Sequence, residues 1–335
     1  MKILQFIIIV ALLVSVSLAQ SFNSEHFSIE KLDDGVYAAI HKTGGYAICN
    51  SGIIDLGNET LVFDCFISPN AAEDLKKAAE ELTGNEVKFV VNSHFHNDHI
   101  RGNQVFVNAQ IISTKRTAEL IEEIEPEELE WEAKVIDDRI ETTTQKLAEE
   151  TDSFKHEELK MWMGYYQAIK ESQGNYKITL PNTFMEDTLV IKGSEREAVL
   201  FTKGKGHTES DIVLWLPEEK ILFSSDLLFV DCHPWLGDGF PQAWIGYLQD
   251  LQKLNAQAIV PGHGPLGSIE DMEIMINYIN TVSSIVDNAI EAQLTEEEIK
   301  QTQIPEEYKE WWFSRFFIPN LVIQYDLKTG KNVQE

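Results

Sequence analysis

Basic residues are scarce in this chain. It carries 27 Lys and Arg against 55 Asp and Glu, which gives a formal net charge of −28 at pH 7. A surface this acidic repels phosphate backbones, which argues against a nucleic-acid substrate. We therefore expect a small-molecule substrate and no nucleic-acid partner.

Cysteine is also scarce, with only three in 335 residues. An oxidising compartment would permit one disulfide, but the sequence does not say which pair forms, or whether any forms. Cys49 and Cys65 lie in strand-like runs and are equally consistent with small buried hydrophobic residues. Cys232 lies off a strand end, past Asp226, and a metal-ligand role there is the weaker alternative.

Glycine and proline are few, and the sequence shows no internal repeat and no low-complexity linker. With 43% hydrophobic residues, the composition is that of a soluble globular protein with a large core. We expect residues 20–335 to form a single large α/β domain.

Long apolar runs are absent except at the N-terminus. The run over 3–18 follows Lys2 and ends in Ser17-Leu18-Ala19, a pattern typical of a secretory signal peptide over residues 1–19. At about fifteen residues it is shorter than the roughly twenty that span a bilayer, which disfavours a membrane anchor. No cysteine follows the cleavage site, which disfavours a lipoprotein. We expect a periplasmic or secreted protein with no stable membrane insertion after cleavage.

The densest group of metal-binding side chains follows an apolar, strand-like run at 87–91 and reads His94-Phe95-His96-Asn97-Asp98-His99. Side chains alternate along an extended chain, so His94 and His96 point the same way and can reach one ion. Asp98 and His99 can then face a second ion. Neutral imidazoles with a carboxylate suit zinc, or iron or manganese at higher coordination.

This His-x-His-x-Asp-His pattern resembles the signature of the metallo-β-lactamase superfamily, which has two further histidines and usually an acidic bridge downstream. Matching residues follow later strand-like runs: His207 after 198–202, Asp226 after 221–225 and His263 after 258–260. Their order and context match the family over most of residues 30–270. The resemblance implies an α/β fold, a four-layer αββα sandwich.

The resemblance also implies a ligand set. Carried over position by position, it assigns His94, His96 and His207 to one metal, Asp98, His99 and His263 to the other, and Asp226 to the bridge between them. It implies two Zn²⁺ ions, with iron or manganese as alternatives, and a shared hydroxide that attacks an acyl bond. Asp98 is the catalytic candidate, because its carboxylate can orient the hydroxide and take up a proton.

The acyl bond itself stays open among lactone, thioester, ester and lactam. β-Lactamases with this motif generally lack the bridging aspartate, whereas hydroxyacylglutathione hydrolases and acyl-homoserine lactonases have it, so Asp226 favours a thioester or lactone. Export favours a β-lactam, which is met in the periplasm. We expect a secreted zinc-dependent hydrolase, with a β-lactamase as the named alternative.

Two other classes remain as alternatives. An iron-dependent oxidoreductase with these ligands would be expected to carry a flavin domain, and the sequence shows none. A non-catalytic metal-binding protein would be expected to lose ligands, and all seven are present.

Two segments depart from the strand pattern. Residues 117–173 are predicted to form a helical insertion of two or three helices, either a solvated decoration or a lid that brings Trp162, Tyr165 and Tyr166 to the metal cleft. The tail over 295–317 is predicted to be helical, since Thr295 and Glu298 have the spacing of a capping box. Its aromatic residues are expected to pack onto the domain.

Overall fold

The computed structural model describes residues 22–331. The predicted signal peptide, residues 1–19, lies outside the described residues. Within the described range, none of the helices combines the length and the apolar character needed to cross a membrane.

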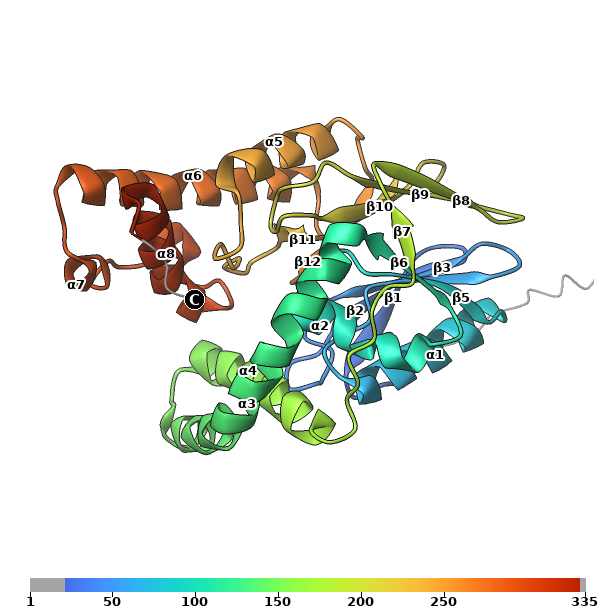
Figure 1. Ribbon diagram of the computed structural model, residues 1–335, viewed down its shortest axis with the longest axis horizontal. Coiled ribbons are helices and arrows are strands. Elements are labelled where there is room, and N and C mark those ends of the chain that lie inside the picture. The colour runs from blue at the N-terminus through green and yellow to red at the C-terminus, as the bar shows by residue number, and fades with distance from the viewer. Residues whose placement is uncertain (1–21, 332–335) are drawn as a thin grey trace, which may run out of the picture.

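The strands form two sheets (Figure 1). The first has seven strands in sequence order, antiparallel from β1 to β4 and parallel from β4 to β7. They are β1 (Phe27–Asp33), β2 (Val36–His41), β3 (Ser51–Asp55), β4 (Thr60–Phe63), β5 (Val87–Val91), β6 (Gln110–Thr114) and β7 (Thr183–Met185). The second has the order β12-β11-β10-β9-β8, with only β11 and β12 parallel. Its strands are β8 (Thr188–Lys192), β9 (Glu197–Thr202), β10 (Ile212–Leu216), β11 (Ile221–Phe229) and β12 (Ala258–His263).

Helices cover the outer face of each sheet. Helix α1 (Pro69–Thr83) contacts β3, β4 and β5 of the first sheet, while α5 (Pro241–Gln252) and α6 (Ile269–Glu291) contact β11 of the second. Alternate side chains of a strand therefore enter different cores. Val213 of β10 packs with the helices, and the next residue, Leu214, packs between the sheets. The predicted four-layer αββα sandwich is confirmed.

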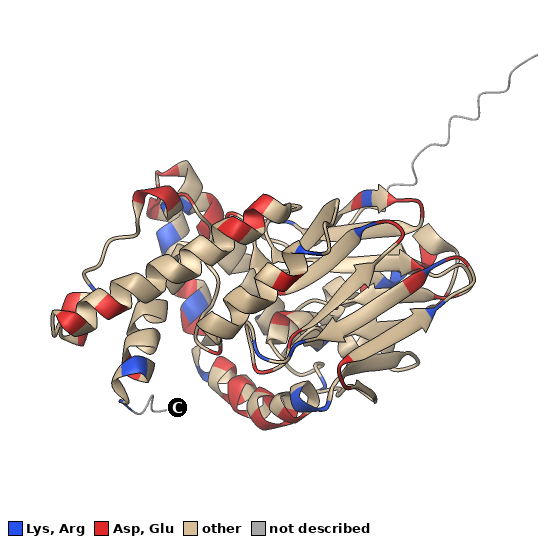
Figure 2. Ribbon diagram, turned by 90° about the horizontal axis from the view of Figure 1, so that it is seen from above, with Lys and Arg blue, Asp and Glu red and all other residues tan. Residues whose placement is uncertain are grey.

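The insertion consists of two helices, α3 (Lys115–Glu149) and α4 (Ser153–Ser172), which pack against each other as a hairpin at one side of the sandwich (Figure 1). Pro126 lies inside α3 without ending it. Acidic residues are spread along the helices, with basic residues among them (Figure 2). The helical prediction for 117–173 agrees with these bounds within two residues.

The prediction of a helical tail over 295–317 is wrong in extent. Helix α7 (Glu296–Ile299) begins at the predicted capping box but makes a single turn, and only the short turns η2 (Glu306–Tyr308) and η3 (Ser314–Phe316) follow. Instead, Trp312 of this segment forms an isolated β-bridge with Cys232, and Phe313 has a left-handed backbone conformation. The longer helix α8 (Phe317–Thr329) begins where the predicted tail ends. Trp311, Phe313 and Phe317 are buried, as expected for a tail that packs onto the domain.

Candidate metal centre

The first two histidines of the cluster, His94 and His96, follow the end of strand β5. Its last residue, Val91, is followed by a buried turn in which the Asn92 amide donates to the carbonyl of Ile112 on β6. The short helix α2 (Asn97–Ile100) then begins with His96 as its N-terminal cap, and η1 (Arg101–Phe106) follows. Asp98 and His99 therefore lie in one helical turn immediately after the extended His94 and His96.

Asp226 lies inside β11 rather than after it. The sequence predicted a strand that ends at Ser225, but β11 continues to Phe229. Its register with β12 shifts at Ser225, which has a positive φ of 46°. A bulge of this kind redirects the next side chain and increases the local twist. The bulge explains how a central strand residue can face the cluster.

Gly262 leaves the space that Asp226 occupies. A Cβ atom added at Gly262 would lie 1.8 Å from Asp226 Oδ1 and 2.8 Å from its backbone nitrogen. Neither the carboxylate nor the strand can keep its place beside such an atom. The small residue in the Pro261-Gly262-His263 sequence is therefore required by the site.

Replacing Gly262 with Ala is expected to displace Asp226 and lower both metal content and hydrolysis, the latter by about tenfold or more. Metal per chain and initial rates measure both effects. Gly246→Ala is the matched control, because an added Cβ there meets nothing within 4 Å on helix α5. Normal metal content and rate in Gly262→Ala would contradict the packing argument.

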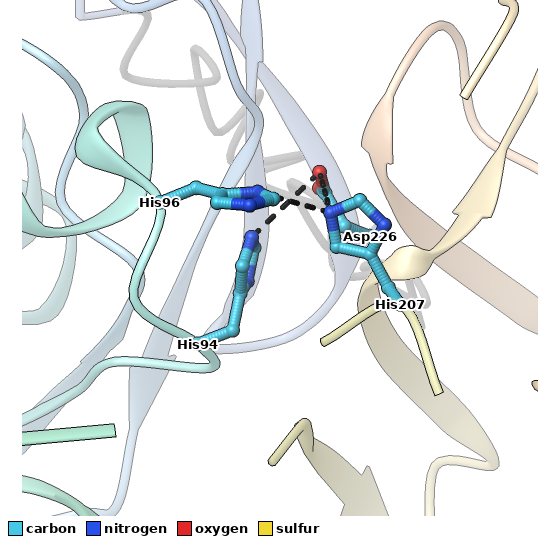
Figure 3. A group of neighbouring side chains, drawn as sticks. All are labelled: His94, His96, His207 and Asp226. Carbon is cyan, nitrogen blue, oxygen red and sulfur yellow. Dashed lines mark hydrogen bonds and ion pairs between the residues drawn. The ribbon is translucent and has the colours of Figure 1, made fainter. Parts of the chain in front are cut away.

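The first group of side chains comes from both halves of the chain. His94 and His96 come from the turn after β5, and His207 and Asp226 come from the second sheet, with all four pointing toward one another (Figure 3). His96 Nδ1 lies 3.0 Å from His207 Nε2, and Asp226 Oδ2 lies 3.4 Å from His207 Nε2 and 3.8 Å from His94 Nε2.

A second group shares the same aspartate. Asp226 Oδ1 lies 3.1 Å from His99 Nε2, and Asp226 Oδ2 lies 3.4 Å from His263 Nε2. Asp98 Oδ2 lies 3.4 Å from His263 Nε2 and 3.7 Å from His99 Nε2. The structure thus brings all seven predicted side chains together, with Asp226 between the two groups. Their roles as metal ligands stay a prediction.

The chemistry of these donors fits divalent ions. His94 Nε2, His99 Nε2 and Asp226 Oδ1 are buried and have no hydrogen-bond partner among residues 22–331. Burial lowers the pKa of His207 to about 3 and that of His94 well below its usual value, which favours the neutral imidazole that binds metal. Burial alone would raise the pKa of Asp226, but His263 and His99 lower it well below its usual range. Five imidazoles around a shared carboxylate match a dinuclear zinc site.

Two carboxylates that were not predicted from the sequence contact His99 and His96. Asp64, fully buried at the end of β4, accepts hydrogen bonds from His99 Nδ1 at 2.9 Å and from Ser93 and Ser225 at 2.8 Å. Asp238 lies 3.1 Å from His96 Nε2. Such partners fix the ring orientation of metal-binding histidines. The position of Asp64 at a strand end was an available signal, whereas nothing local marks Asp238.

All three cysteines are buried free thiols. Cys49 Sγ lies near Asp98 and His99, but burial raises its pKa to about 12, and the thiol donates to the Asp98 carbonyl oxygen at 2.9 Å. Cys232 belongs to none of the candidate metal groups found in the described part of the chain. The weaker alternative of Cys232 as a ligand therefore has no structural support.

A cluster of five histidines and two aspartates, set in an αββα sandwich, defines the metallo-hydrolase class of α/β proteins. The sequence profile of the metallo-beta-lactamase superfamily matches residues 44–263. The chain belongs to this superfamily.

Relatives and solved structures agree. The chain is 24% identical to the metallo-beta-lactamase type 2 of Pseudomonas aeruginosa over 255 residues, which cover 73% of this chain and 81% of that protein. Identity to the metallo-beta-lactamase type 2 of Bacillus cereus is 34% over 82 residues, 23% of this chain but only 32% of that protein. A metallo-beta-lactamase from Pontibacter korlensis superposes with a TM-score of 0.53 at 18% identity, covering 76% of this chain and 99% of the other. VMB-1 gives 0.54 at 20% identity, with 78% and 100% covered. These structural likenesses show the shared fold.

Proposed function

We propose that the protein is an exported, zinc-dependent hydrolase that uses two metal ions to cleave an acyl bond of a small substrate. The observation that carries the proposal is the position of Asp226, with carboxylate oxygens within 3.4 Å of His207, His99 and His263. One carboxylate that contacts both histidine groups is suited to bridge two ions. Export is proposed from residues 1–19 alone.

Individual residues have different roles in the proposed hydrolysis. When bound, two divalent ions would lower the pKa of a water molecule and polarise the acyl carbonyl. Asp98 is 12% exposed at its side chain, so its carboxylate can reach solvent and substrate. It orients the attacking water, accepts its proton and passes the proton to the leaving group as the tetrahedral species collapses. Asp64 and Asp238 keep the rings of His99 and His96 in place.

A thioester or lactone is the favoured substrate, because the family resemblance associates an aspartate at this position with hydrolases of those bonds. A β-lactam is the second candidate. It is supported by the names of the relatives from Pseudomonas aeruginosa and Bacillus cereus, both metallo-beta-lactamases.

Metal analysis by mass spectrometry, paired with a hydrolysis screen over nitrocefin, lactones and thioesters, tests the proposal. We expect two zinc ions per chain, hydrolysis of at least one thioester or lactone, loss of activity with a chelator and its return with Zn²⁺. Preferential cleavage of nitrocefin would replace the favoured substrate by the second candidate. A metal-loaded protein that cleaves none of these bonds would overturn the proposal. N-terminal sequencing of the mature protein tests export, which fails if residues 1–19 are retained.

A further inference from the structure

The cluster is largely buried, and His96 and Asp98 are its most exposed members. Side-chain exposure is 19% for His96 and 12% for Asp98, but 7% or less for His94, His99, His207, Asp226 and His263. A substrate therefore reaches the cluster from the side of His96 and Asp98. The side chains that surround this opening decide what can enter.

A first series of side-chain contacts around the cluster starts at His96 and runs through the loop after β11. Asp238 Oδ2 lies 3.1 Å from His96 Nε2 and also accepts a 2.8 Å hydrogen bond from the indole nitrogen of Trp235. The Trp235 ring packs edge-on against Phe316 of the C-terminal segment, with ring centroids 5.4 Å apart. His96 is thus connected to an aromatic pair by direct contacts.

The C-terminal segment carries the contacts on to the other histidine group. Phe316 stacks with Phe313 at 5.8 Å, and Phe313 packs edge-on against His263 at 5.2 Å. Phe313 has a φ of 60°, a left-handed conformation uncommon for an aromatic residue. The strained backbone holds its ring against a predicted metal ligand, so the contacts lead from one histidine group to the other.

The helical insertion provides a second series of side-chain contacts. Tyr165 of α4 accepts a 3.2 Å hydrogen bond from Asn97, the neighbour of His96, and packs against Trp162 at 5.8 Å. Trp162 packs in turn against Phe313 at 5.5 Å and Phe316 at 5.6 Å. Two series of contacts, which meet at Phe313, therefore join the His96 turn to His263. We call their five aromatic residues the aromatic rim: Trp162, Tyr165, Trp235, Phe313 and Phe316.

The rim is apolar, with the carboxylate of Asp238 beside Trp235 and the guanidinium of Arg315 beside Trp162. Trp235, Phe316 and Tyr165 are partly exposed, so their rings are available to a ligand. Asp238 is the only charged side chain in the two series of contacts. Arg315, an exposed residue, lies over the Trp162 ring at 3.7 Å and donates one hydrogen bond to Tyr166. An apolar group on the substrate would gain contacts with the exposed aromatic rings.

We propose that the aromatic rim is the acyl-binding subsite and that the substrate carries a bulky apolar acyl group of aryl size. This inference rests on the proposed hydrolase function and specifies its substrate class. Three segments far apart in sequence build the subsite: the loop after β11, helix α4 of the insertion and the segment before α8.

The test compares phenylacetyl and acetyl thioesters of 2-mercaptoethanol, which share a small neutral leaving group. For the native protein we expect kcat/KM to be at least about tenfold higher with phenylacetyl. Trp235→Ala and Phe316→Ala should each lower the ratio of the phenylacetyl value to the acetyl value about tenfold, toward one. Trp235→Phe should keep the preference, because it keeps a ring while losing the hydrogen bond to Asp238. Trp131→Ala, at a tryptophan that is 53% exposed on α3, is the matched control and should change neither value.

A binding measurement separates the subsite from the chemistry. N-methylphenylacetamide, an uncleaved analogue, should bind the isolated protein in ligand-observed NMR and lose binding in Trp235→Ala, while N-methylacetamide should not bind. Analogue binding without hydrolysis of any ester, thioester, lactone or β-lactam would refute the proposed function and leave the subsite standing. Hydrolysis with no phenylacetyl preference, unchanged in both alanine variants, would refute the subsite and leave the proposed function standing.

Discussion

Replacing Asp226 with Asn is expected to reduce tightly bound metal from two ions to one per chain and to lower turnover by about a hundredfold or more. Loss of a residue that only orients a metal-binding histidine costs roughly 10- to 100-fold, so loss of a shared ligand should cost at least the upper value. The change keeps the size and shape of the side chain and removes its charge.

The environment of Asp226 gives the reason. Its side chain is 4% exposed, and its two oxygens lie within 3.8 Å of His94, His99, His207 and His263. An amide presents one neutral oxygen and one NH₂ group, so it cannot bridge two cations. Weak binding of the second ion should follow directly.

Metal content by mass spectrometry and kcat for the substrate found in the screen measure these effects. Asp231→Asn is the matched control. Asp231 is exposed, has a φ of 54° that Asn tolerates, and lies outside the cluster. Two tightly held ions and an unchanged rate in Asp226→Asn would refute the bridging role.

Replacing Arg101 with Met is expected to lower the free energy of unfolding by about 3–5 kcal/mol, because it leaves buried charges without a partner. Arg101 is 2% exposed at its side chain, and its Nη1 lies 2.9 Å from Glu132 while its Nε lies 3.1 Å from Glu125. Both glutamates are buried on α3. Burial raises the pKa of Glu132, and Arg101 opposes that rise.

Urea unfolding of the metal-loaded protein measures the loss. Arg116→Met is the control, because the ion pairs of Arg116 with Glu209 and Glu119 are solvent-exposed and should contribute less than about 1 kcal/mol. Adding Glu125→Gln and Glu132→Gln to Arg101→Met should restore part of the stability by removing the unpaired charges. Equal unfolding free energies for Arg101→Met and the native protein would contradict the prediction.

These ion pairs also bear on the insertion. Arg101 follows His99 by two residues, and Asn97 donates to Glu128 of α3 at 2.7 Å. The hairpin of α3 and α4 is therefore bonded to the predicted metal turn by buried side chains. Its role as a lid stays a prediction, but a purely solvated decoration would not place two buried glutamates against this turn.

The sequence predicted the sandwich and the full set of candidate ligands through its resemblance to the metallo-β-lactamase superfamily, and its own patterns support that resemblance. Alternating or continuous apolar runs mark strands wherever one or both faces are buried, and five of the seven predicted ligands come just after such runs. His94, His96, Asp98 and His99 lie within six residues, so the local backbone conformation largely sets their relative positions. Local spacing therefore grouped the first four candidate ligands, and the family resemblance added His207, Asp226 and His263.

Tertiary structure decided what surrounds these ligands. The bulge at Ser225 depends on pairing between β11 and β12, so the sequence placed the strand end too early. Asp238 reaches His96 across 142 positions of the chain, and Phe313 of the aromatic rim contacts His263 from a segment without regular pattern. Local propensity also misjudged the tail, because residues 300–316 form only short hydrogen-bonded turns and are held by contacts with distant segments, such as the β-bridge between Trp312 and Cys232. Side chains that meet only after folding leave no periodic signal in the sequence, which is why the candidate ligands were readable from the chain and their supports and the aromatic rim were not.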